Sequence, residues 1–368
     1  MTNTIKCINI VFKIILVILP FALALFVTEI ITRYYYFGSL SMKNGTPDGQ
    51  FVRYNEELGW SMIPNSEGYF SNPIVGYNGF VKFDQNGVRV NDNRFSPKGE
   101  SIIVIGDSTT AGLEVDNNET YVAILEKLFF ENGCEYRFYN AGVRGYGTDQ
   151  SLWNLERLIS VVNPKFVIYM FSSSDFLDNR TIKRPNTKYS KPVFIINHNE
   201  LNVINRPSKI FDTPYYSFVE YSTSGHKVID GYYKNPIPLI KDFLKRHLAI
   251  YYPLRAVSEY FQISPEVKVQ ENTRYPDLEI LESILTNIKS YGVELFITSY
   301  PLEEQKLFIN DIRDISDKLD IKYLDISPYF TEEPTNYQWT KDGHWNEKGH
   351  FQTAYALYEL LGHHLCIQ

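Results

Sequence analysis

The segment from Ser101 to Leu113 reads SIIVIGDSTTAGL and places a serine hydroxyl directly after a short aliphatic run. The run stops at Gly106, and Ser108 follows with Asp107 between them. A serine at the carboxyl end of a buried parallel strand faces solvent, and it can attack an acyl carbon once a base takes its proton. Gly, Asp and Ser are also ordinary turn residues, so this triplet alone favours a plain turn.

A histidine near the other end of the chain is the candidate base. His344 lies in the stretch KDGHWN, just before the last expected helix. It could accept the Ser108 proton and later return it to the leaving alcohol. Asp342 lies two residues earlier in an expected extended loop, so it would point to the same side and fix the histidine tautomer. Taken singly, each is an ordinary loop or capping residue.

Acyl transfer also needs donors for the oxygen of the tetrahedral intermediate. The backbone N–H groups of Ser108 and Gly142 and the hydroxyl of Ser174 are the candidates. Asp107 and Asp175 each adjoin one of these residues, and we expect both to support the site. Gly142 and the serines around residue 174 are also common loop residues, so their joint placement carries the prediction.

Strands alternate with helices in the part of the chain that carries these residues. Alternation of this kind predicts a parallel sheet covered by helices on both faces. The carboxyl ends of parallel strands meet at one edge, so all the candidate residues should converge there. The expected strands are 102–105, 135–139, 166–171, 294–298 and 322–326, and the expected helices are 121–131, 148–162, 276–291, 303–319 and 346–361.

The first 37 residues predict a membrane anchor. Residues 8–31 are almost wholly apolar, and a spanning helix needs about 20 such residues. Tyr34 begins a short aromatic run typical of the membrane interface, and positive charge precedes the apolar run. This pattern orients the remaining chain outside the cytoplasm, in the periplasm or at the cell surface. A cleaved signal peptide is the alternative, although its small-x-small triplet at Ala22 lies inside the apolar run.

Two further regions lack the alternating pattern. Residues 38–100 predict a β-rich linker, with Asn78-Gly79 and Asn86-Gly87 as hairpin-type turns. The main domain then spans 101–368, with an insertion at about 180–270 that includes a basic amphipathic stretch at 236–261. An insertion of this size would serve as a lid over the active edge or as an extra packing subdomain.

Composition narrows the classes of partner. The formal net charge is −7, and the soluble part has no run of Lys and Arg, which argues against nucleic acid. Three cysteines, Cys7, Cys134 and Cys366, show no metal-type spacing and predict no disulfide framework. Cys134 and Cys366 could pair only if the fold brings them together. No metal or cofactor is expected.

Four blocks together resemble the SGNH/GDSL hydrolase superfamily, and specifically its membrane-anchored bacterial branch. The blocks are GDSTTAG, NAGVRGYGTD, FSSSDFLDN and DGHWNEKGH, within residues 100–180 and 275–360. The resemblance implies a flavodoxin-like three-layer α/β/α fold, a nucleophile at Ser108 and a base at His344. It also implies oxyanion donors from Ser108, Gly142 and the third block.

Two positions depart from the pattern of this superfamily. Ser174 stands where members carry an Asn, and loss of one oxyanion donor can lower kcat by about 10² to 10³. Many members also place the acid three residues before the histidine, where this chain has Lys341. Asp342, two residues before, resembles the arrangement in SGNH-like polysaccharide acetylation proteins.

The residues therefore predict a membrane-anchored serine esterase that forms an acyl-enzyme at Ser108. Its substrate would be an ester-bearing small molecule or an envelope glycan. Two alternatives stay open: an O-acyltransferase of the same fold, and a degenerate domain that binds a glycan or partner without catalysis. A phosphate-binding site after Ile105 is disfavoured, because no GxGxxG or GxxxxGK pattern is present.

Overall fold

Five parallel strands form the central sheet, as the sequence predicted. The computed structural model describes residues 2–37, 51–72, 75–92, 95, 98–184, 187–197, 200–211, 215–222, 225–232, 248–251, 275–301, 306–340 and 342–366. The strand order is β14-β13-β7-β5-β6. The strands are β5 (Glu100–Gly106), β6 (Tyr136–Asn140), β7 (Phe166–Phe171), β13 (Glu294–Ser299) and β14 (Lys322–Leu324).

This strand order is the flavodoxin-like one. Numbered along the chain, the five strands lie in the order 2-1-3-4-5, so the direction of the winding reverses between β5 and β7. Ligands of such sheets bind outside the carboxyl ends of the strands at this switch point. The carboxyl end of β5 is Gly106, and Ser108 follows after Asp107. The topology therefore puts the candidate nucleophile at the expected edge.

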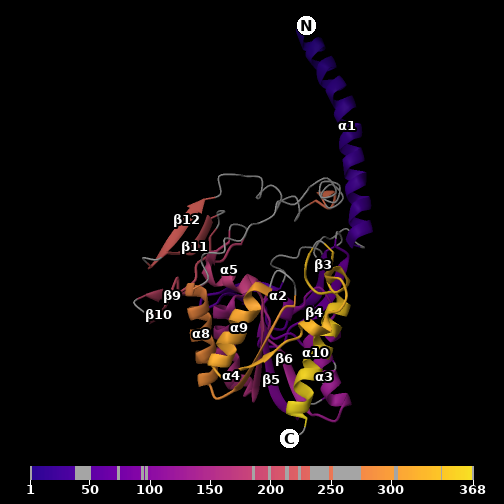
Figure 1. The fold of residues 1–368 in the computed structure, drawn as a ribbon. Helices are drawn as coiled ribbons and strands as arrows, with labels where there is room; N and C mark the ends of the chain where they lie inside the picture. The colour runs from indigo at the N-terminus through magenta and orange to yellow at the C-terminus, as the bar shows by residue number, and fades with distance from the viewer. Residues whose placement is uncertain are drawn as a thin grey trace.

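Helices cover both faces of the sheet, and Figure 1 shows α4, α8 and α9 on one side with α3 and α10 on the other. The alternation along β7 explains the two cores. Val167, Tyr169 and Phe171 enter one apolar cluster, whereas Phe166, Ile168 and Met170 enter the other. The helices are α2 (Ser108–Ala111), α3 (Tyr121–Glu131), α4 (Thr148–Val162), α5 (Ser174–Arg180), α8 (Tyr275–Ser290), α9 (Lys306–Lys318) and α10 (Glu347–Leu365).

The segment before the sheet folds onto the α/β domain. It contains two antiparallel pairs, β1 (Val52–Asn55) with β2 (Gly59–Met62) and β3 (Glu67–Asn72) with β4 (Tyr77–Lys82). Their apolar side chains share a third cluster with Ala111 of α2. Residues 51–72 and 75–92, predicted as part of a linker, thus supply one wall around the segment that carries Ser108.

Buried Arg89 connects this segment to the end of α2. Its guanidinium donates to the carbonyl oxygens of Ala111, Gly112 and Val115. These carbonyls lie at and after the carboxyl end of α2, where a helix leaves acceptors without partners. Arg89 therefore satisfies the groups that the short helix cannot pair internally.

One of the two predicted hairpin turns is wrong. Asn86-Gly87 does form a turn, since Gly87 has φ of 72° and its N–H donates to Asp84 O. Asn78-Gly79 instead lies inside β4. A Cβ at Gly79 would come within 2.7 Å of the carbonyl oxygens of Leu113 and Val115. Glycine is needed there for close backbone approach, which a sequence pattern cannot distinguish from a turn.

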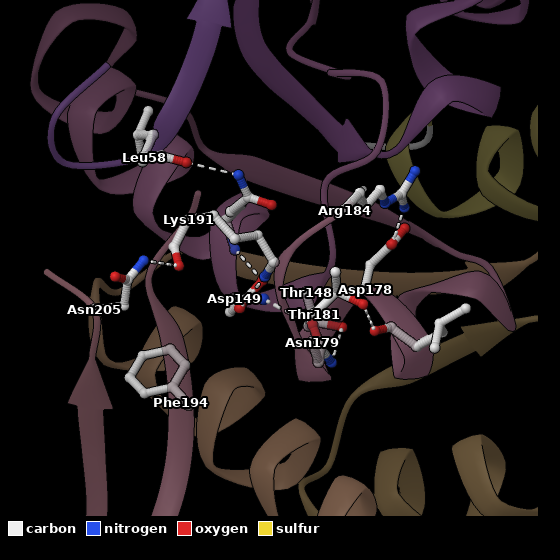
Figure 2. Close-up of polar contacts among 12 residues, drawn as sticks. Leu58, Thr148, Asp149, Asp178, Asn179, Thr181, Arg184, Lys191, Phe194 and Asn205 are labelled. Atoms are coloured by element: carbon white, nitrogen blue, oxygen red, sulfur yellow. Dashed lines mark hydrogen bonds and ion pairs between the residues drawn. The ribbon is translucent and has the colours of Figure 1, made fainter. Parts of the chain in front are cut away.

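The insertion contributes antiparallel strands beside the main sheet. They are β8 (Thr181–Lys183), β9 (Val193–Asn197), β10 (Glu200–Ile204), β11 (Tyr215–Ser222) and β12 (Gly225–Tyr232). Most of the predicted amphipathic stretch at 236–261 lies outside the described residues. An ion pair joins the insertion to α4, as Figure 2 shows. Lys191 Nζ lies 2.5 Å from Asp149 Oδ2. Arg184 pairs with Asp178 of α5 beside it.

Helix α1 (Thr2–Phe37) extends away from the rest of the protein in Figure 1. Where it meets the domain, the carboxylate of Glu29 accepts the N–H groups of Ala249 and Ile250. Among the described residues, no helix combines the length and the hydropathy that crossing a membrane requires.

A disulfide joins Cys134 to Cys366, with Cα atoms 5.5 Å apart. The sequence predicted no disulfide framework, and that expectation is wrong for this pair. Cys134 precedes β6 and Cys366 caps α10, so α10 packing on α3 brings them together. The two cysteines are 232 residues apart along the chain, so no local sequence pattern indicates that they are close in space.

Candidate active site

The structure brings Ser108, His344 and Asp342 into one hydrogen-bonded row. His344 Nε2 lies 2.8 Å from Ser108 Oγ, and His344 Nδ1 lies 2.5 Å from Asp342 Oδ1. The contact between His344 and Ser108 joins residues 236 positions apart along the chain. The contact between Ser108 and His344 is within hydrogen-bond reach for proton transfer from a nucleophile to its base, and the shorter contact with Asp342 orients that base. The row can therefore remove the serine proton.

The end of β5 and the first turn of α2 present Ser108. Asp107 is the N-cap of α2, and its carboxylate accepts the N–H of Thr109 at 2.8 Å. Ser108 is the first residue of this helix. The N–H groups of a first helical turn have no acceptor within the helix, so that of Ser108 can serve an oxyanion.

A tight loop before α10 presents the base and the acid. Asp342 N donates to Trp339 O, and Trp339 N donates to His344 O, which closes the loop on itself. Trp345 next to the base is almost fully buried, and Asn346 caps α10 by accepting the N–H of Gly349. The loop is therefore anchored on both sides of His344.

Charges around the base favour its protonated form. Burial alone would lower the pKa of His344, but the Glu114 carboxylate and the hydrogen bond to Asp342 outweigh it and raise that pKa above 6.5. Burial alone would raise the pKa of Asp342, yet the hydrogen bond and the charge of His344, with the charge of Arg144, lower it. Asp342 thus remains an anion that stabilises the imidazolium formed during attack.

Glu114 and Arg144 belong to this site, and the sequence reasoning missed both. Glu114 Oε1 lies 3.7 Å from His344 Nδ1 and 2.5 Å from Arg144 Nη1. Glu114 comes six residues after the nucleophile, and Arg144 lies in the block after β6. A single acid within the apolar run AGLEV was the one available signal, because a buried acid needs a partner.

Two of the three predicted oxyanion donors, Gly142 N and Ser174 Oγ, are engaged with other groups. Gly142 N donates to Asn140 Oδ1 at 3.1 Å. A Cβ on Gly142 would come within 2.3 Å of Ala111 N, so the glycine lets this loop touch α2. Ser174 Oγ lies 3.0 Å from Ser172 Oγ and 3.3 Å from Asp107 Oδ2. Ser174 thus supports Asp107 in this structure.

Asp107 and Asp175 are both buried behind the site. Burial raises the pKa of Asp107, although its hydrogen bonds from Thr109 and Ser174 oppose the shift. Burial also raises the pKa of Asp175 well above 3.8, and the charge of Asp107 adds to the effect. Asp175 Oδ2 accepts from Tyr169 OH at 2.6 Å and from Ser172 N at 3.1 Å, which holds the start of α5.

One group of acidic and histidine side chains in the described part of the chain is close enough together to be considered as a metal site. It consists of Glu114, Asp342 and His344, whose ligand atoms lie within 4.8 Å of one another. The guanidinium of Arg144 already pairs with Glu114, and the Nδ1 atom of His344 is hydrogen-bonded to Asp342. This donor set does not fit a metal ion, because Arg144 already supplies the positive charge that pairs with Glu114, and Asp342 already bonds Nδ1 of His344.

Two curated relatives match the chain in sequence. The esterase TesA of Pseudomonas aeruginosa is 31% identical over 78 residues, which are 21% of this chain and 39% of that protein. An arylesterase of Vibrio mimicus is 25% identical over 109 residues, which are 30% of this chain and 54% of the relative. The sequence matches support the resemblance to the SGNH/GDSL hydrolase superfamily. No protein-family model matches the chain.

Solved structures of esterases also align with the chain. The family 3 carbohydrate esterase of Clostridium thermocellum gives a TM-score of 0.40 at 15% identity, covering 73% of this chain and 98% of that chain. The psychrotrophic esterase EstA of Pseudoalteromonas sp. gives a TM-score of 0.40 at 11% identity, covering 73% and 99%.

Proposed function

We propose that this protein is a serine carboxylic ester hydrolase of the SGNH/GDSL type. The observation that carries the proposal is the row Ser108–His344–Asp342, with contacts of 2.8 Å and 2.5 Å. The sequence matches to two esterases agree with it. The chain spans 39% and 54% of those relatives, so the activity of the whole protein is inferred from its own site.

The proposed reaction has two stages, acylation of Ser108 and hydrolysis of the acyl-enzyme, and each uses the row Ser108–His344–Asp342. Ser108 Oγ bonds to the carbonyl carbon of the ester while His344 Nε2 takes its proton. The backbone N–H of Ser108 lies at the start of α2, where it can donate to the negative oxygen. Collapse breaks the bond to the alkoxy oxygen, which leaves with the proton from His344. Water then attacks the acyl carbon while His344 takes its proton, the bond from that carbon to Ser108 Oγ breaks, and His344 returns the proton to Oγ as the acid product leaves.

Replacing the nucleophile tests the proposal. Ser108→Ala should abolish hydrolysis of a short-chain aryl ester, because no other hydroxyl contacts His344 among the described residues. Ser316→Ala is the matched control, since it removes a buried hydroxyl on α9 that bonds Ile312 O. Equal activity in the Ser108→Ala variant and the wild type would refute the assignment.

The identity of the acyl acceptor is a finer proposal. We propose that water is the acceptor and that the substrate is an O-acylated envelope glycan or a small ester. The 28 Tyr and 24 Phe residues agree with a sugar-binding surface. An O-acyltransferase of the same fold would form more product when a polysaccharide is added. Product formation independent of the polysaccharide would support the hydrolase.

Membrane anchoring outside the cytoplasm is the third part of the proposal. Apolar side chains on the described part of α1 are exposed, among them Leu19 and Phe21. The disulfide Cys134–Cys366 agrees with an oxidising compartment. Cell fractionation with protease protection tests this: the domain should be in the membrane fraction and accessible from outside the cytoplasm. Recovery in the soluble fraction would contradict anchoring.

A binding module without catalysis is the competing function, and Ser174 in the place of the usual Asn favours it. The hydroxyl of Ser174 bonds Ser172 and Asp107. A fluorophosphonate probe separates the two functions, because it reacts only with an activated serine. Labelling that disappears in Ser108→Ala supports the hydrolase, and absence of labelling in the wild type supports the binding module.

A further inference from the structure

His344 faces two carboxylates on its Nδ1 side. Asp342 Oδ1 makes the direct hydrogen bond at 2.5 Å, and Glu114 Oε1 lies 3.7 Å from the same nitrogen. The Glu114 side chain is only 1% exposed. A buried negative charge this close interacts strongly with an imidazolium, because little water screens it.

The structure holds Glu114 in this place from two directions. Arg144 Nη1 pairs with Glu114 Oε1 at 2.5 Å, and its guanidinium lies over the Phe70 ring at 5.1 Å. The backbone on both sides of Glu114 is fixed as well, since Arg89 donates to Gly112 O and Val115 O. A carboxylate restrained at side chain and backbone cannot easily turn away from His344.

We propose that Glu114 is a positioning residue for His344, and that its buried carboxylate, held by Arg144, shares with Asp342 the stabilisation of the protonated base. The proposal rests on the hydrolase function proposed above. It adds a fourth and a fifth residue to the machinery, with Arg144 acting through Glu114. The charge of Glu114 is also the main contribution that raises the pKa of His344, ahead of the bond to Asp342.

An isosteric charge removal tests this role. Glu114→Gln keeps a carbonyl oxygen for Arg144 but removes the negative charge beside His344. The acid limb of kcat/KM should move to lower pH by about one unit, because loss of a nearby opposite charge lowers a histidine pKa. The plateau kcat should fall about tenfold with little change in KM. Glu114→Asp, which keeps the charge, should recover part of both effects.

Glu126→Gln is the matched control. Glu126 is also a buried glutamate and lies on α3. Its Oε2 accepts a hydrogen bond from Asn91 Nδ2 at 2.6 Å. The same substitution there should leave the acid limb unchanged, because the charged groups that shift the pKa of His344 are Glu114, Asp342 and Arg144. If Glu114→Gln and Glu126→Gln give the same pH profile as the wild type, the positioning role is overturned.

A second variant keeps the proposal testable if Glu114→Gln does not fold. In Asp342→Asn the remaining carboxylate of Glu114 should preserve part of the activity. We expect a loss of about 10²-fold, against about 10⁴-fold where the acid of a triad acts alone. Activity of Asp342→Asn at the level of Ser108→Ala would contradict the shared role. Ester hydrolysis that persists in Ser108→Ala would refute the proposed serine hydrolase. The failure of the proposed function is therefore distinguishable from the failure of the shared role.

Discussion

Replacing Lys191 by methionine should destabilise the protein more than any surface lysine change. The Lys191–Asp149 pair is almost wholly inaccessible, with side chains 2% and 0% exposed, and its atoms are 2.5 Å apart. Burial lowers the pKa of Lys191 and raises that of Asp149, while each charge opposes the shift of the other. Methionine has a similar length but leaves the carboxylate without its counter-charge.

The magnitude follows from the burial of both partners. Removing one member of a buried ion pair costs about 3–5 kcal/mol, because the other charge stays desolvated and unpaired. For a chain of this size the melting temperature should fall by roughly 5 °C. Lys127→Met is the matched control: Lys127 pairs with Glu131 on the surface of α3 at 3.7 Å, and the expected change is below about 1 kcal/mol.

The assay is chemical or thermal unfolding of the wild type, Lys191→Met, Lys127→Met and the double variant Asp149→Asn with Lys191→Met. Neutralising the orphaned carboxylate should recover a large part of the stability in the double variant. Two results would refute the reasoning. One is a Lys191→Met effect as small as that of Lys127→Met, and the other is a double variant less stable than Lys191→Met.

The remaining predictions concern the disulfide and the pH dependence. Cys134→Ser with Cys366→Ser should lose up to about 5 kcal/mol of stability, since the bond closes a loop of 232 residues, and thermal unfolding with and without reductant measures it. Equal melting temperatures in both conditions would contradict this. The acid limb of kcat/KM should have its midpoint above about pH 6.5, because the pKa of His344 is raised and only the neutral ring accepts a proton. An activity profile that stays flat down to about pH 4 would argue against His344 as the base.

The sequence alone predicted most of the sheet, and it placed Ser108, His344 and Asp342 at one edge, where the structure has them in contact. Strand β7 was predicted without error, because six consecutive apolar residues lie between Lys165 and Ser172. Helices α3 and α4 also have their predicted bounds. The sequence indicated Ser108 and His344 because each follows a predicted strand, and the carboxyl ends of parallel strands lie at one edge of the sheet. Their contact of 2.8 Å agrees with that logic.

Residues whose roles depend on packing between loops could not be predicted. Glu114 and Arg144 meet across 30 positions of sequence, and neither has a neighbour in sequence that indicates a charge partner. Gly79 carries a turn signal but serves a close contact with the backbone after α2. Cys134 and Cys366 pair because α10 returns along α3. In each case the deciding distance is set by the tertiary fold, which local patterns do not contain.

The hydrogen bonds of Arg89 tie the candidate active site to the segment that precedes the central sheet. A shortened protein beginning at Glu100 would keep the whole central sheet, yet three carbonyl groups next to the nucleophile would lose their donor. It would also lose Phe70 and Val81, which share a buried apolar cluster with Leu113. Grafting this active site onto another scaffold therefore requires transfer of residues 51–92 together with the strands that follow.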